Sequence, residues 1–151
     1  GKFKNVYDDC SCLVEFGKNV DGIIWMSKSA TGFKKGLSLK LIGTKGSIIW
    51  NHENPETYFL YQKNNIINKI ERSSFSTSLL KRYSRFKPGH PEGFLEAFSN
   101  IYKDFNQIIA SSKTNKKINY KYYDTDTVTS GLNFLNAISK SAKEKKWIKI
   151  R

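Results

Sequence analysis

The sequence is poor in the residues that most often mark catalytic or metal-binding chemistry. It holds two histidines, two cysteines, three prolines and one methionine among 151 residues. It contains no glycine-rich dinucleotide fingerprint, no phosphate-binding loop and no nucleophile elbow. Two histidines are too few for a histidine-based metal site, and no run of about 18 apolar residues predicts a membrane span. The residues alone therefore present no catalytic constellation.

Acidic residues are also scarce. The chain has 13 of them and 26 lysines and arginines, which gives a net charge of +13. Such a balance suggests a nucleic-acid partner. The lysines are dispersed, however, through expected loops, turns and helix ends, and no nucleic-acid-binding motif accompanies them. We therefore expect no nucleic-acid partner, while a basic nucleic-acid-binding domain stays as the weaker alternative.

The two cysteines, Cys10 and Cys12, lie two positions apart on one expected strand. Side chains with this spacing face the same side of a strand, and a disulfide between them would distort the extended backbone. We interpret them as reduced core thiols, which is typical of a cytoplasmic protein.

Short apolar segments separated by turn residues predict about six β-strands, and the first two form an antiparallel hairpin around residues 17–22. The expected strands are 10–16, 23–27, 37–42, 47–50, 57–61 and 66–70. Several of them, such as 48–50 and 58–61, are apolar on both faces. One face can pack on helices, so the other needs a cover, and a second copy of the chain is the simplest one. The alternative is a set of short central strands with a few exposed aromatic residues.

Two long helices are expected after the strands. Pro91 suits a first helical position, which makes His90 the N-cap of a helix over residues 91–110. The second helix is capped by Asp126 or Thr127, and residues 147–150 form a last strand. We predict a single α+β domain over residues 1–151. It has a mostly antiparallel open sheet, two main helices packed on one face and the other face free for oligomerisation.

One candidate site emerges beside the first long helix. His90 at a helix N-terminus is expected to keep a neutral ring that can hydrogen-bond a sugar hydroxyl. The irregular segment 71–88 before it is either a solvated loop or part of an anion or polyol site. We assign substrate binding to His90, Lys87 and Arg85. The alternative is that His90 only caps the helix, and His52 is expected to be exposed in a polar turn.

Four segments, taken in order, carry a resemblance to a known family. The entry to the first strand at residues 8–9 matches loosely, and residues 39–56, 89–102 and 127–147 match well. Together they resemble the C-terminal domain of the Gfo/Idh/MocA oxidoreductases, the relatives of glucose–fructose oxidoreductase and inositol dehydrogenase. Two departures are Asp126, where the family usually has proline, and Ser130, where it usually has aspartate.

The resemblance implies the substrate-binding and oligomerisation half of an oxidoreductase that acts on a sugar or polyol. NAD or NADP would belong to the intact protein, and this chain would bind neither. The family's dinucleotide fingerprint, its segment with the catalytic lysine and its Asp-x-x-x-His motif have no counterpart in these 151 residues. The alternative is a stand-alone binding or assembly module without enzymatic activity.

The isolated 151-residue chain is therefore expected to show no dehydrogenase activity and no tight binding of NAD or NADP. The check is nicotinamide absorbance at 340 nm with a panel of sugars and polyols, together with titration of NADH fluorescence. Measurable turnover by the chain alone would contradict this expectation.

Overall fold

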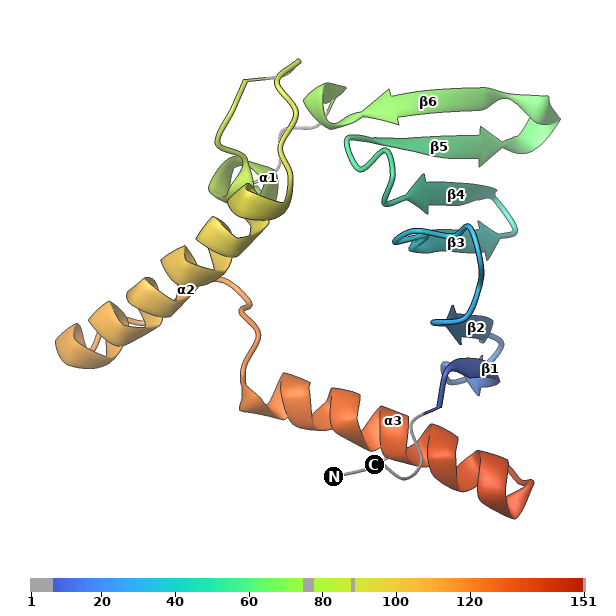
Figure 1. Cartoon of the computed structure of the whole chain (residues 1–151). Coiled ribbons are helices and arrows are strands. Elements are labelled where there is room, and N and C mark those ends of the chain that lie inside the picture. The colour runs from blue at the N-terminus through green and yellow to red at the C-terminus, as the bar shows by residue number, and fades with distance from the viewer. Residues whose placement is uncertain (1–6, 75–77, 88, 151) are drawn as a thin grey trace. The chain divides into compact units, whose positions relative to one another are not determined.

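The computed structural model describes residues 7–74, 78–87 and 89–150, and its elements confirm the α+β class (Figure 1). Among these residues six strands precede three α-helices, and one short 3-10 turn follows each of the last two strands. The strands are β1 (Asp9–Glu15), β2 (Asp21–Ser27), β3 (Ser38–Gly43), β4 (Gly46–Asn51), β5 (Thr57–Gln62) and β6 (Ile67–Glu71). The 3-10 turns are η1 (Lys63–Asn65) and η2 (Arg72–Ser74), and the helices are α1 (Ser78–Tyr83), α2 (Phe94–Thr114) and α3 (Thr125–Glu144).

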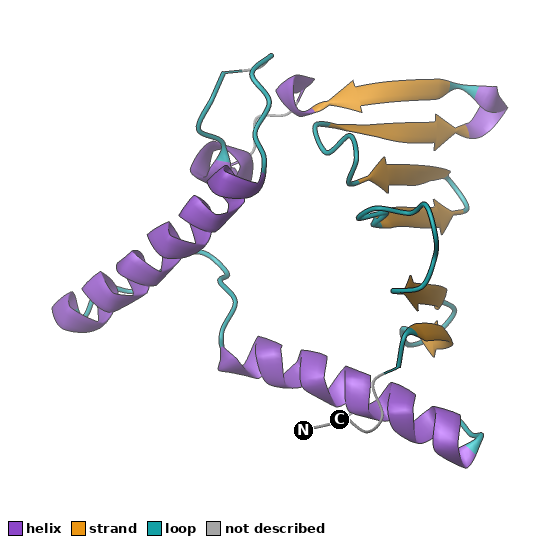
Figure 2. Cartoon of the chain, viewed as in Figure 1, coloured by secondary structure: helices purple, strands orange, loops and turns teal. Residues whose placement is uncertain are grey.

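The strands form two antiparallel sheets where one sheet was expected (Figure 2). β1 and β2 make a two-stranded hairpin, and β3, β4, β5 and β6 make a four-stranded meander in chain order. The chain likewise divides into two compact units. One unit holds residues 1–32 and 121–151, and the other holds residues 33–120. The expectation of a single domain stays a prediction.

The β1–β2 hairpin has the predicted pairing, with Cys12 opposite Ile24. Its turn takes left-handed backbone at Gly17 and Asn19, which are residue types that adopt a positive φ at low cost. Both cysteines are free, and they are half-buried where a core position was expected. Burial nevertheless raises the pKa of the Cys12 thiol.

The four-stranded sheet is apolar on both faces, as the sequence predicts. On one face Leu39 pairs with Trp50, and Trp50 pairs in turn with Tyr58. On the opposite face Ile49 pairs with Phe59. Ile42 at the edge strand is 84% exposed. The sheet therefore presents apolar side chains that its own strands do not cover.

Helix α2 begins at Phe94, so the prediction that it starts at Pro91 with His90 as the N-cap is wrong. Gly93 is the N-cap, and its N–H donates to Oε2 of Glu96 at 2.8 Å. The reason is that the Glu92 side chain is held by groups outside the helix, as described below. His90 therefore lies three residues before the N-cap of α2, outside the helix.

The second long helix also begins earlier than expected, because Asp124 is its N-cap and not Asp126 or Thr127. The Asp124 carboxylate accepts a hydrogen bond of 2.9 Å from the N–H of Thr127. The prediction of a last strand is wrong as well, because residues 147–150 join neither sheet. The Ser141 hydroxyl donates to the carbonyl of Lys146 and ties this segment back to α3.

Both long helices are amphipathic, and their apolar stripes are open. Among the described residues no apolar side chain is buried. On α2 the stripe includes Phe98, Ile101 and Phe105, and on α3 it includes Leu132 and Leu135. In the same described part, no helix is long and apolar enough to cross a membrane.

A pair of glycine substitutions tests the sheet. A Cβ added at Gly46 would lie 2.6 Å from the carbonyl oxygen of Tyr61, so Gly46→Ala must push β4 away from β5. We expect it to lower the free energy of unfolding by about 1–3 kcal/mol. The measurement is denaturant unfolding followed by tryptophan fluorescence.

The matched control is Gly131→Ala on α3, where an added Cβ meets nothing within 4 Å. Alanine is the better helix former, so this variant should gain about 0.5–1 kcal/mol. Equal stability of the two variants would contradict the tight β4–β5 pairing at Gly46.

Candidate functional site

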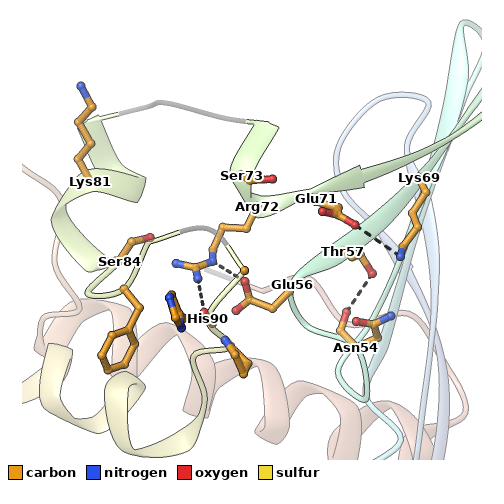
Figure 3. Close-up of a pocket in the computed structure, with 13 residues that line it drawn as sticks. Asn54, Glu56, Thr57, Lys69, Glu71, Arg72, Ser73, Lys81, Ser84 and His90 are labelled. Carbon is orange, nitrogen blue, oxygen red and sulfur yellow. Dashed lines mark hydrogen bonds and ion pairs between the residues drawn. The ribbon is translucent and has the colours of Figure 1, made fainter.

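The candidate site is a cavity of about 400 Å³ in the unit of residues 33–120 (Figure 3). It lies where the start of β5, the end of β6 and the loop before α2 meet. Most of its lining residues carry polar or charged side chains, with Phe86 and Pro91 as the apolar members. The other lining residues are Asn54, Glu56, Thr57, Lys69, Glu71, Arg72, Ser73, Lys81, Ser84, Gly89 and His90.

Arg72 organises one wall of this cavity. It follows β6 directly, and its N–H bonds the carbonyl of Glu56 at 2.8 Å, so the two residues close the open end of the β5–β6 hairpin. Its Nε donates to Oε2 of Glu56, its Nη1 to Oε1 of Glu92 at 2.9 Å, and its Nη2 to the carbonyl of His90 at 3.1 Å. The guanidinium therefore joins the sheet to the loop that carries His90.

Glu92 receives three of the hydrogen bonds in this network on one oxygen. Its Oε1 accepts from Nη1 of Arg72, from the N–H of Arg85 at 2.7 Å and from the N–H of Phe86 at 2.8 Å. Burial alone would raise the pKa of Glu92, but these donors outweigh it and hold the pKa below its ordinary value of 4.5. The carboxylate is therefore charged at neutral pH and fixes the loop backbone.

Of the three residues predicted to bind substrate, the structure places His90 in the lining of the cavity and the other two outside it. Nη2 of Arg85 donates to Oδ1 of Asn100 on α2 at 3.1 Å. The exposed Lys87 offers its carbonyl to the N–H of His90 at 3.2 Å. A substrate role for Arg85 and Lys87 stays a prediction. His52 is exposed, with its ring 6.0 Å from that of Trp50.

The charged side chains of the lining are largely paired, with Glu92 outside the lining as one of the partners. Lys69 lies 3.6 Å from Glu71, and Arg72 is shared between Glu56 and Glu92. Lys81 points away from the cavity (Figure 3). In the part of the chain that the structure describes, no cluster of histidine, cysteine, aspartate or glutamate could hold a metal ion. The cavity therefore offers neutral hydrogen-bonding groups more than free charge.

Glu56 and Glu92 were not predicted from the sequence to belong to the site. Glu56 precedes β5 and Arg72 follows β6, so the pairing of these two strands brings the residues together. The expected strands 57–61 and 66–70 already contained that signal. Glu92 was not identified from the sequence because the expected helix start at Pro91 placed it inside the first helical turn.

A second polar cluster joins α1 to α2 outside the cavity. The guanidinium of Arg82 pairs with Asp104, and the Tyr83 hydroxyl donates to the same carboxylate at 2.8 Å. Arg82 also lies over the Tyr120 ring, 3.3 Å from its centroid. None of these four residues lines the cavity, so the cluster serves to attach the helices.

Comparisons with known proteins agree on one protein family. A family profile described as "Oxidoreductase family, C-terminal alpha/beta domain" matches residues 2–150. The uncharacterized oxidoreductase YfiI of Bacillus subtilis is 25% identical over 141 residues, which are 91% of this chain and 36% of the relative. An oxidoreductase structure from Sinorhizobium meliloti is 29% identical with a TM-score of 0.75, over 85% of this chain and 36% of that one.

An inositol dehydrogenase homolog from Azotobacter vinelandii, solved with NADH and myo-inositol, has the same fold. Its TM-score is 0.82 at 23% identity, over 91% of this chain and 37% of that one. The present chain thus spans little more than a third of the length of these relatives.

The low pKa of Glu92 predicts a pH-dependent contribution to stability. Because the folded-state pKa lies below the unfolded one, the stabilisation is complete above about pH 4.5 and is lost as the pH falls through the folded value. Glu92→Gln should therefore cost about 1–3 kcal/mol at pH 7, and the difference from the parent should shrink steadily below pH 4.5. Denaturant unfolding at several pH values measures it.

The control is Glu71→Gln, because Glu71 is 59% exposed and its pairing with Lys69 is screened by water. It should change the free energy of unfolding by about 0.5 kcal/mol or less at pH 7. A Glu92→Gln effect that stays constant from pH 7 to pH 3 would contradict the charged network.

Proposed function

This chain belongs to the Gfo/Idh/MocA oxidoreductase family as its C-terminal alpha/beta domain, and we propose that it supplies the substrate pocket and a subunit interface of an NAD(P)-dependent oxidoreductase. The substrate class is a sugar or polyol. The observation that carries this proposal is the cavity beside His90, whose polar lining has its charges paired.

The chemistry of the lining favours an uncharged polyhydroxylated ligand over an anion. Asn54, Ser73, Ser84 and His90 can each donate or accept a hydrogen bond, as a ring of hydroxyl groups requires. A phosphate or carboxylate would instead need a free cation that points into the cavity. Arg72 is shared by two carboxylates, Lys69 lies beside Glu71, and Lys81 points away (Figure 3). The myo-inositol bound by the Azotobacter homolog is a ligand of this uncharged kind.

The nicotinamide cofactor is assigned to a part of the protein outside these 151 residues. The sequence has no glycine-rich turn between a strand and a helix that could hold a pyrophosphate, so its residues do not fit the dinucleotide. The role of the described residues is then to bind and orient the substrate. The structures of the Azotobacter inositol dehydrogenase homolog with NAD+ and with NADH support a cofactor of this type.

The interface is assigned to the apolar sheet of the second unit, with a second copy of the chain as the partner. Its strands expose Leu39, Leu41, Ile42 and Ile67. A single-layer sheet with apolar side chains on both faces needs cover on both. Helices of the chain can cover one face, and the same face of a second copy can cover the other in a two-fold arrangement.

Replacing His90 tests the pocket. His90→Gln in the full-length protein should raise the KM for the polyol about tenfold, which is the loss of one well-placed hydrogen bond. The affinity for NADH should not change. Steady-state kinetics with a panel of neutral sugars and polyols, followed by NADH titration, gives both numbers.

The matched control is His52→Gln, because His52 is exposed and lies outside the cavity lining. Its KM should equal that of the parent. If His90→Gln also left the KM unchanged, or if no neutral polyol or sugar were turned over, the proposed function would be wrong.

A further inference from the structure

We propose that Arg72 and Glu92 are positioning residues that hold His90 at the cavity. The inference rests on the proposed function, because it takes His90 as the residue that contacts the substrate. Both residues affect substrate affinity through their contacts with the loop before α2.

The loop that carries His90 has little regular structure of its own. The N–H of His90 reaches the carbonyl of Lys87 at 3.2 Å, and Gly89 has a φ of +87°. The carbonyl of His90 is bonded by Nη2 of Arg72 at 3.1 Å. Two residues further on, Glu92 takes the N–H groups of Arg85 and Phe86. The ion pair thus holds the loop on both sides of His90.

The Arg72–Glu92 ion pair is shielded from water, so breaking it should have a measurable effect. The side chains of Arg72 and Glu92 are 18% and 12% exposed, whereas Lys69 and Glu71 are more than half exposed. Exposed ion pairs contribute little, but breaking a shielded pair leaves a charge without its partner. Without the charge on Glu92, the Arg72 guanidinium keeps only Glu56, which belongs to the sheet side of the network.

Displacement of His90 is expected to weaken substrate binding more than any other property of the protein. His90 is part of the cavity lining, and its backbone carbonyl is held by Nη2 of Arg72 (Figure 3). A shift of about 1 Å is enough to lose a directional hydrogen bond to a ligand. The residues that hold the cofactor are assigned to other polypeptide, so His90 is not one of them. The affected constant is therefore the KM for the polyol.

The chain offers a matched control in the second ion pair. Arg82 and Asp104 are 16% and 18% exposed, and they tie α1 to α2 without lining the cavity. Asp104→Asn removes the same charge as Glu92→Gln, from a pair of similar exposure. A general loosening of the unit would affect both variants alike, whereas positioning of His90 affects only Glu92→Gln.

The experiment uses the full-length protein and the neutral sugar or polyol that it turns over fastest in a panel that includes myo-inositol. Glu92→Gln should raise the KM about tenfold and change kcat less than about threefold, with unchanged NADH affinity as the sign of correct folding. Arg72→Lys keeps the charge but cannot reach all three partners, so it should show a smaller rise. Asp104→Asn should leave the KM at the parent value.

The decisive variant is the double substitution of His90→Gln with Glu92→Gln. If Glu92 acts through His90, the double variant should have the KM of His90→Gln alone, because the residue being positioned is already gone. Additive rises, or an equal rise in Asp104→Asn, would overturn the positioning role while the proposed function stands. No effect of His90→Gln would instead overturn the proposed function and the positioning role with it.

Discussion

The unit of residues 33–120 depends on the need to satisfy the shielded guanidinium of Arg72. A cation that is only 18% exposed requires carboxylates and carbonyls within hydrogen-bonding reach. The chain brings them from three places, which are Glu56 before β5, Glu92 before α2 and the carbonyl of His90. Sheet, loop and helix start are thereby fixed to one another, and the cavity is the space left beside that junction.

The apolar side chains impose a different constraint, because hydrophobic burial is the main favourable term in folding. The four-stranded sheet is apolar on both faces, and the stripes of α2 and α3 are open in the described residues. Polar clusters such as Arg82 with Asp104 fix local geometry, but they do not replace buried apolar area. The chain therefore carries more apolar surface than its own described elements cover.

Much of this fold is readable from the sequence, because strands and helices follow local periodicity. The six strands and the two long helices were predicted within a few residues, and turn glycines and asparagines marked the connections. One error has a partner distant in sequence as its cause, because α2 starts at Phe94 where Glu92 bonds Arg72. The other is local, because the side chain of Asp124 bonds the N–H of Thr127 and caps α3 earlier than expected.

The residues of the candidate site are harder to predict from the sequence than the strands and helices. His90 could be singled out beside its proline, but Glu56 and Arg72 meet only through the register of β5 and β6. Charge could not have located the cavity either. The chain carries a net charge of +13, yet the lining holds only three cations, of which Lys69 and Arg72 are each paired with a carboxylate and Lys81 points away (Figure 3). Most of the basic excess therefore lies outside the cavity, and recognition inside it is left to hydroxyl, amide and imidazole groups.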